Sequence, residues 1–108
     1  MPKTKPISEV VRQRAIVAVA TGWELGCPVA GSRTDGQAAL ADVCLRRYFS
    51  LDRRGVAKSD RNEQIHDLAM GMVEASGQTL RQVGPLIREY EWLAEQVLTA
   101  ITTTAPVP

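Results

Sequence analysis

Aromatic, histidine and cysteine residues are scarce in this sequence of 108 residues, and each scarcity excludes a class of protein. Two Trp, two Tyr and one Phe leave the core to Ala, Val, Leu, Ile and Met, a composition that favours helices over strands. The two cysteines, Cys27 and Cys44, form neither a CxxC motif nor a disulfide framework, and we expect free thiols in a reducing compartment. No apolar run approaches the roughly 20 residues that cross a bilayer.

The overall composition is that of a folded cytoplasmic domain. Hydrophobic residues make up 44% of the chain and charged residues 23%, which excludes a disordered protein. Basic residues precede the apolar stretch "AIVAVATG" and "ELGC" follows it, as in a lipoprotein signal, but Trp23 and Glu24 interrupt that pattern. We therefore expect one cytoplasmic domain over residues 1–108, with flexible tails at 1–7 and 103–108.

Start and stop signals predict four helices. Ser8 can cap the first helix, and Gly26 is placed to end it just after the C-cap. Thr34 and Gln37 predict a capping box at the start of the second helix, because their spacing suits two reciprocal side-chain bonds to the backbone. The four predicted helices cover residues 8–25, 34–54, 60–76 and 79–102.

The spacing of apolar residues indicates an all-α fold. The fourth helix has one apolar face with the three-four spacing of a bundle seam, formed by Leu80, Val83, Ile87, Tyr90, Ala94, Val97 and Ile101. Gly84 and Pro85 fall near the start of this helix and predict a kink or a break there. The period-two alternation of strands is nowhere sustained. We expect an all-α, four-helix bundle-like domain that forms a dimer.

Positive charge is concentrated in the middle of the chain. Residues 46–61 contain six basic and two acidic residues, whereas residues 62–108 contain two basic and six acidic residues. The basic set, named here the arginine stripe, consists of Arg46, Arg47, Arg53, Arg54, Lys58 and Arg61. At about 100° per residue, its four helical arginines project to one side, about 140° from the expected core side. Such a stripe can hold a phosphate backbone or an acidic protein surface, although charged outer faces and cations near a helix C-terminus are also ordinary.

Two apolar features do not fit an isolated monomer. Trp92 lies on the far side of its helix from the seam, where a tryptophan would be exposed. The first helix has two apolar faces, Val10, Val11, Val17 and Ala18 on one side and Ile16, Val19, Ala20 and Trp23 on the other. A helix that is apolar all round is normally buried on all sides. This predicts an interface with a second copy or another protein, unless a loop or tail covers these residues.

The sequence offers little for catalysis or metal binding. Glu63-x-x-His66 matches one half of a di-metal motif, but both residues lie opposite the apolar side of their helix. Cys27 is in a glycine-rich loop, and nothing in the spacing brings it near His66. A helix-turn-helix at residues 79–93 is disfavoured because its recognition helix would be acidic. We expect no enzyme activity, no metal and no cofactor.

These patterns together predict a regulatory or adaptor module that binds another protein. Trp92, or the face with Ile16, Val19 and Trp23, would be the apolar anchor, and the arginine stripe would steer the partner. The alternative is a nucleic-acid-binding module that uses the stripe. The expected partners are another protein or a second copy, with nucleic acid as the alternative and no membrane.

Overall fold

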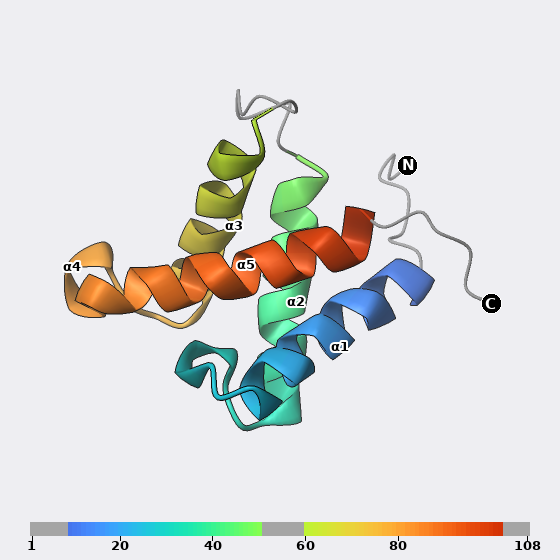
Figure 1. Ribbon diagram of the computed structural model, residues 1–108, viewed down its shortest axis with the longest axis horizontal. Coiled ribbons are helices and arrows are strands. Elements are labelled where there is room, and N and C mark those ends of the chain that lie inside the picture. The colour runs from blue at the N-terminus through green and yellow to red at the C-terminus, as the bar shows by residue number, and fades with distance from the viewer. Residues whose placement is uncertain (1–8, 51–59, 103–108) are drawn as a thin grey trace, which may run out of the picture.

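The computed structural model describes residues 9–50 and 60–102, and these residues are arranged as helices with short connections (Figure 1). The elements are α1 (Glu9–Glu24), the 3₁₀ turn η1 (Pro28–Ala30), α2 (Thr34–Tyr48), α3 (Arg61–Ala75), α4 (Leu80–Val83), the 3₁₀ turn η3 (Gly84–Leu86) and α5 (Ile87–Thr102). No strand occurs in the described ranges, so the all-α prediction is confirmed for them. Ser8 and the predicted tails lie outside these ranges.

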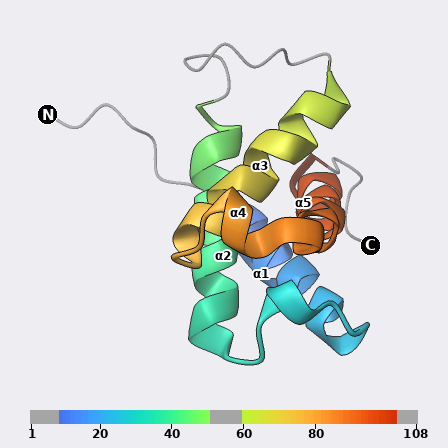
Figure 2. The same cartoon turned by 90° about the vertical axis from the view of Figure 1, so that its left-hand side faces the viewer.

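The four long helices form two crossed layers. α1 and α5 lie side by side and antiparallel in the front layer of Figure 1, and α2 and α3 form an antiparallel pair behind them. Figure 2 shows the same two layers from the side. The Cα radius of gyration is 13.4 Å, close to the value of about 13 Å for a compact domain of this length. Each layer therefore turns one face to the core and one face outwards.

Gly26 ends α1 as the sequence predicted. Its φ is +93°, in the left-handed region that glycine adopts without strain. The Gly26 N–H donates to the carbonyl of Trp23, and the Cys27 N–H donates to the carbonyl of Gly22. These two bonds make a Schellman motif, which satisfies carbonyls left open at the helix end. The chain is thereby turned into η1, which packs between α1 and α5.

The second helix begins at Thr34 as predicted, but its predicted cap and its predicted end differ from the structure. The capping box is wrong, because Arg33 occupies the N-cap position and no side chain caps the helix. The Gln37 amide instead donates to the carbonyl of Gly31 at 2.8 Å. α2 ends at Tyr48, six residues before the predicted end, in a tightened turn in which the Ser50 N–H donates to the carbonyl of Arg47 and the Ser50 hydroxyl donates to the carbonyls of Arg46 and Arg47. Such local side-chain bonds compete with the continuation of a helix.

The C-terminal helical segment consists of three elements. Thr79 caps α4 in a complete capping box with Gln82, which is the reciprocal bonding that the sequence at Thr34 failed to produce. Gly84, with a φ of +53°, then starts η3, and α5 follows. Leu80, which we placed on the buried seam, is half exposed, because the four-residue α4 lies at the edge of the molecule (Figure 1). The seam positions of α5 are buried or partly buried.

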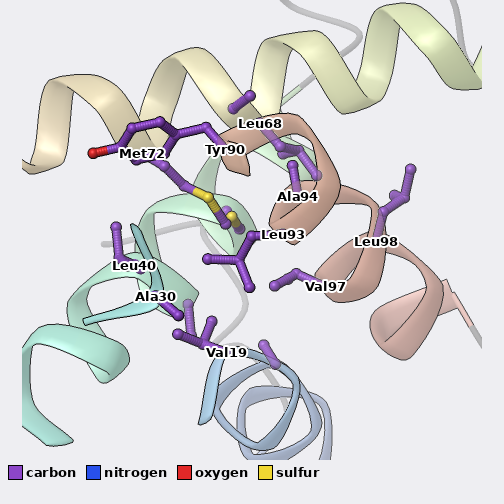
Figure 3. Close-up of a cluster of buried hydrophobic side chains, with 14 of the residues drawn as sticks. Val19, Ala30, Leu40, Leu68, Met72, Tyr90, Leu93, Ala94, Val97 and Leu98 are labelled. Carbon is purple, nitrogen blue, oxygen red and sulfur yellow. The ribbon is translucent and has the colours of Figure 1, made fainter. Parts of the chain in front are cut away.

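The core lies between the two layers (Figure 3). Leu93 of α5 points to its centre, with Val19 of α1 on one side and Met72 of α3 on the other. All three side chains are fully buried. Burial of a Leu, Val or Met side chain contributes about 1.5–3 kcal/mol each, and this burial positions α5 with its opposite side facing outwards.

Candidate functional site

The outward side of α5 contains an exposed tryptophan between two charges of opposite sign. Arg88, Trp92, Glu95 and Thr99 recur every three or four residues, so they lie on one face of the helix. All four are exposed, and Trp92 retains 37% of its accessible surface. The opposite side of α5 is in the core. The sequence prediction that Trp92 lies away from the seam is therefore confirmed.

Trp92 is held against α1 at a close approach of the two helices. A Cβ atom on Gly22 would lie 2.6 Å from Cδ1 of Leu93 and 3.5 Å from Cζ3 of Trp92, so any larger residue there would have to displace the buried Leu93 side chain. Leu25, three residues after Gly22 and just beyond the end of α1, is 71% exposed. Leu25 and Trp92 line one surface pocket of about 340 Å³, together with Arg88. We name these residues, with Glu95, the Trp92 face.

Leu25 was not among the predicted site residues. It lies seven residues after Ala18 and fourteen after Val11, so helical periodicity places it on the apolar face that contains these two residues. Its place beside Trp92 arises from the antiparallel contact of α1 with α5, residues that are far apart in sequence. Val10 and Val17 extend the exposed apolar surface of α1, and each keeps 59% of its accessible surface. They belong to the apolar face with Val11 and Ala18 that the sequence indicated.

The face with Ile16, Val19 and Trp23 is not an exposed anchor. Val19 is fully buried in the core, and Ile16 is partly buried against it. Trp23 is exposed, but it lies three turns after Arg12, whose guanidinium bonds Asp42 of α2 at 2.9 Å. Eleven residues rotate a helix by about 20° beyond three full turns, which places Trp23 on the side of α1 nearer α2. The structure therefore does not bring Trp23 and Trp92 together on one face.

The arginine stripe is also divided by the structure. Arg46 is exposed on α2, as predicted. Arg47, which we expected to face solvent, turns towards α3 and is only 23% exposed. Its Nη1 bonds a carboxylate oxygen of Asp67 at 3.2 Å, and its Nη2 bonds Glu74 at 3.0 Å. The Arg47 stem crosses Gly71, where a Cβ atom would be 2.5 Å from its Cδ. Arg47 therefore joins α2 to α3.

Of the remaining stripe residues, Arg61 is the one within the described ranges. The guanidinium of Arg61 donates to the hydroxyl of Thr99 on α5 at 2.6 Å. Arg53, Arg54 and Lys58 lie outside the described residues. Beside Arg47, a surface pocket of about 550 Å³ contains three carboxylates, and it is lined by Arg47, Asp60, Asn62, Glu63, His66, Asp67 and Met70. Carboxylates at this position repel a phosphate backbone.

Both cysteines are buried free thiols. Loss of hydration on burial raises the pKa of Cys44 to about 12. Burial also raises the pKa of Cys27, whose Sγ lies 3.8 Å from the carbonyl oxygen of Glu89. Because the thiolate is the reactive form, neither cysteine has the lowered pKa of a nucleophile. Cys27 is buried and lines the pocket beside Trp92.

His66 is paired across two helices. Its Nδ1 lies 3.1 Å from a carboxylate oxygen of Glu91 on α5, and both side chains are partly exposed. Glu63 is exposed on the same helix as His66, as the sequence indicated. Among residues 9–50 and 60–102, no three His, Cys, Asp or Glu side chains gather in a way that could hold a metal ion.

Two further findings concern the whole described chain. Within the described ranges, no helix has both the length and the apolar character that a membrane span requires. No protein-family model, curated protein or solved structure is significantly similar to this chain. The Trp92 face is therefore the strongest indication of function.

Proposed function

We propose that this protein is a non-catalytic regulatory or adaptor module that binds a protein partner, in a dimer or a hetero-complex, through the Trp92 face. The observation that carries this proposal is Trp92, 37% exposed on the outward side of a helix whose opposite side is in the core. A tryptophan contributes more to protein interfaces than almost any other residue, because it removes a large area from water at a small cost in conformational entropy.

The surroundings of Trp92 also suit an interface. Leu25 adds an exposed apolar side chain, and Arg88 and Glu95 add charges at the margin. An apolar centre with a charged margin is the usual arrangement of a protein contact surface. The buried free thiols of Cys27 and Cys44 suit the cytoplasm, where we expect the module to act.

The experiment is site-specific photocrosslinking in the cells that make the protein. Leu25 is replaced by benzoylphenylalanine in one variant, and Ala39, which is exposed on α2 in the other layer, is replaced in the control. We expect the Leu25 position to give a discrete crosslinked protein band, and the Ala39 position to give none. Adding Trp92→Ala should remove most of the band, because it removes the apolar anchor.

The proposal is refuted if the two positions give equal crosslinks, or if Trp92→Ala leaves the Leu25 band unchanged. Circular dichroism of each variant checks that the fold is retained, and Leu25, at 71% exposed, tolerates substitution.

The nucleic-acid alternative stays a prediction. Half of the arginine stripe lies outside the described residues, and Arg47 and Arg61 bond other side chains of the fold. Of the three stripe residues within the described ranges, Arg46 and Arg61 are exposed, and Arg47 is only 23% exposed.

A further inference from the structure

We propose that the partner on the Trp92 face is a second copy of this chain, packed so that the two α5 helices run antiparallel about a two-fold axis near Trp92. This inference rests on the proposed function and names the partner for the same surface. Its basis is the order of charges along α5. Arg88 of one copy lies opposite Glu95 of the other copy only when the two helices run antiparallel.

The positions of the charges along α5 are symmetric about Trp92. Arg88 and Glu95 are each 3.5 residues from the midpoint between Glu91 and Trp92, which corresponds to about 5 Å along the helix axis. A two-fold axis at that midpoint, perpendicular to α5 and in the interface plane, brings Arg88 of one copy level with Glu95 of the other. The same operation makes the second pair, because a two-fold interface repeats every contact.

The tryptophans then meet at the axis. Trp92 is half a residue from the midpoint, less than about 1 Å along the helix. Its exposed ring would be covered by the Trp92 ring of the other copy, and the two ion pairs would flank this apolar centre. Packed helix axes approach to about 8–10 Å, a separation at which both rings and both charge pairs can touch.

The charges also exclude a parallel pair of α5 helices. In a parallel arrangement, each Arg88 faces the Arg88 of the other copy and each Glu95 faces the other Glu95. Like charges that face one another repel, so the antiparallel pair is favoured. On the α1 side, Leu25 is close to the same axis, because its neighbour Gly22 lies level with Trp92 and Leu93. Leu25 therefore adds apolar area to the same interface.

The experiment is sedimentation velocity on the purified full chain and on charge-reversed variants. We expect the wild-type chain to sediment as a dimer at micromolar concentrations. Arg88→Glu alone, or Glu95→Arg alone, should weaken the dimer by roughly tenfold or more, because each change turns both attractive pairs into repulsive ones.

Mixing the two single variants gives the decisive result. In a heterodimer of Arg88→Glu with Glu95→Arg, every facing pair is again of opposite sign. We expect the mixture to recover dimers that neither variant forms alone, and the double variant in one chain to recover them as well. Arg88 and Glu95 are about 10 Å apart along one helix, so this recovery cannot arise within a chain.

Arg46→Glu is the matched control, since it reverses an exposed helical arginine in the other layer. It should leave the dimer unchanged. The inference is overturned if the wild-type chain is a monomer, if its dimer ignores both charge reversals, or if the mixed variants fail to associate. If the chain is a monomer but still gives a crosslinked band through Leu25 in cells, the proposed function stands with a different partner. If the chain is a monomer and gives no such band, both the dimer and the proposed function are refuted.

Discussion

Replacing Gly71 with alanine tests whether Arg47 holds α2 and α3 together. Gly71 is buried on α3, and a Cβ atom there would lie 2.5 Å from Cδ and 2.6 Å from Nε of Arg47. In an open helix the same change stabilises by about 1 kcal/mol, because alanine has the higher helix propensity. At Gly71 the new methyl group must displace the Arg47 side chain. The guanidinium then loses its bonds to Asp67 and Glu74.

The size of that loss follows from the exposure of the two pairs. Arg47 and Asp67 are 23% and 14% exposed, so their charge-assisted bonds are partly shielded from water. A hydrogen bond to a charged group contributes about 1.5–3 kcal/mol. Glu74, at 65% exposed, adds little because solvent screens it. We expect Gly71→Ala to lower the free energy of unfolding by about 1 kcal/mol after the propensity gain of about 1 kcal/mol.

The effect of Gly71→Ala on the free energy of unfolding should change from destabilising to stabilising when Arg47 is removed first. In an Arg47→Ala background nothing occupies the space above Gly71, and Gly71→Ala should then stabilise by about 1 kcal/mol. The measurement is urea unfolding followed by far-UV circular dichroism, in a double-mutant cycle of the two changes. Gly36→Ala on α2 is the matched control, because its Cβ would meet no atom within 4 Å and it should stabilise in both backgrounds. A stabilising Gly71→Ala in the wild-type chain would refute this account of the Arg47 contact.

Three further predictions concern the thiol, a helix cap and the core. The pKa of Cys44 is raised to about 12 by burial, so the unfolded chain, whose thiol titrates near pH 8.5, gives up its proton first. The Cys44 contribution to the free energy of unfolding is therefore complete below about pH 8.5 and falls by about 1.4 kcal/mol per pH unit above it. Urea unfolding at rising pH should show this fall in the wild-type chain, with the slope smaller by that amount in Cys44→Ala. Thr79→Ala removes the hydroxyl that accepts from the Gln82 N–H in the capping box and should lower the unfolding free energy by about 1 kcal/mol in the same assay, whereas no change would mean that the cap is redundant. Leu93→Ala, at the fully buried centre of the core, should cost about 3–5 kcal/mol by urea or thermal unfolding, and a cost below about 1 kcal/mol would contradict the packing in Figure 3.

The sequence predicted the features that depend on neighbouring residues. The end of α1 at Gly26 is local, because a glycine with positive φ and two nearby backbone bonds stop a helix wherever it lies in the fold. The outward position of Trp92 is local as well, since helical periodicity places it opposite Tyr90 and Val97. The capping box at Thr34 shows the limit of such patterns. There Arg33 is the N-cap, and the Gln37 amide bonds the carbonyl of Gly31 beyond the helix instead.

Only the tertiary structure decided which helix flank meets a neighbour. Helical angles correctly placed Arg47 away from the centre of the core, but α3 packs along that flank of α2 and pairs it with Asp67. On α1, two apolar faces were equal in sequence, and the contact of Gly22 with Leu93 selected the side that contains Val19 for the core. Leu25 reached Trp92 by the same contact. Local periodicity determines which side of a helix is apolar, whereas the neighbours of each side depend on packing between segments distant in sequence, which no local pattern contains.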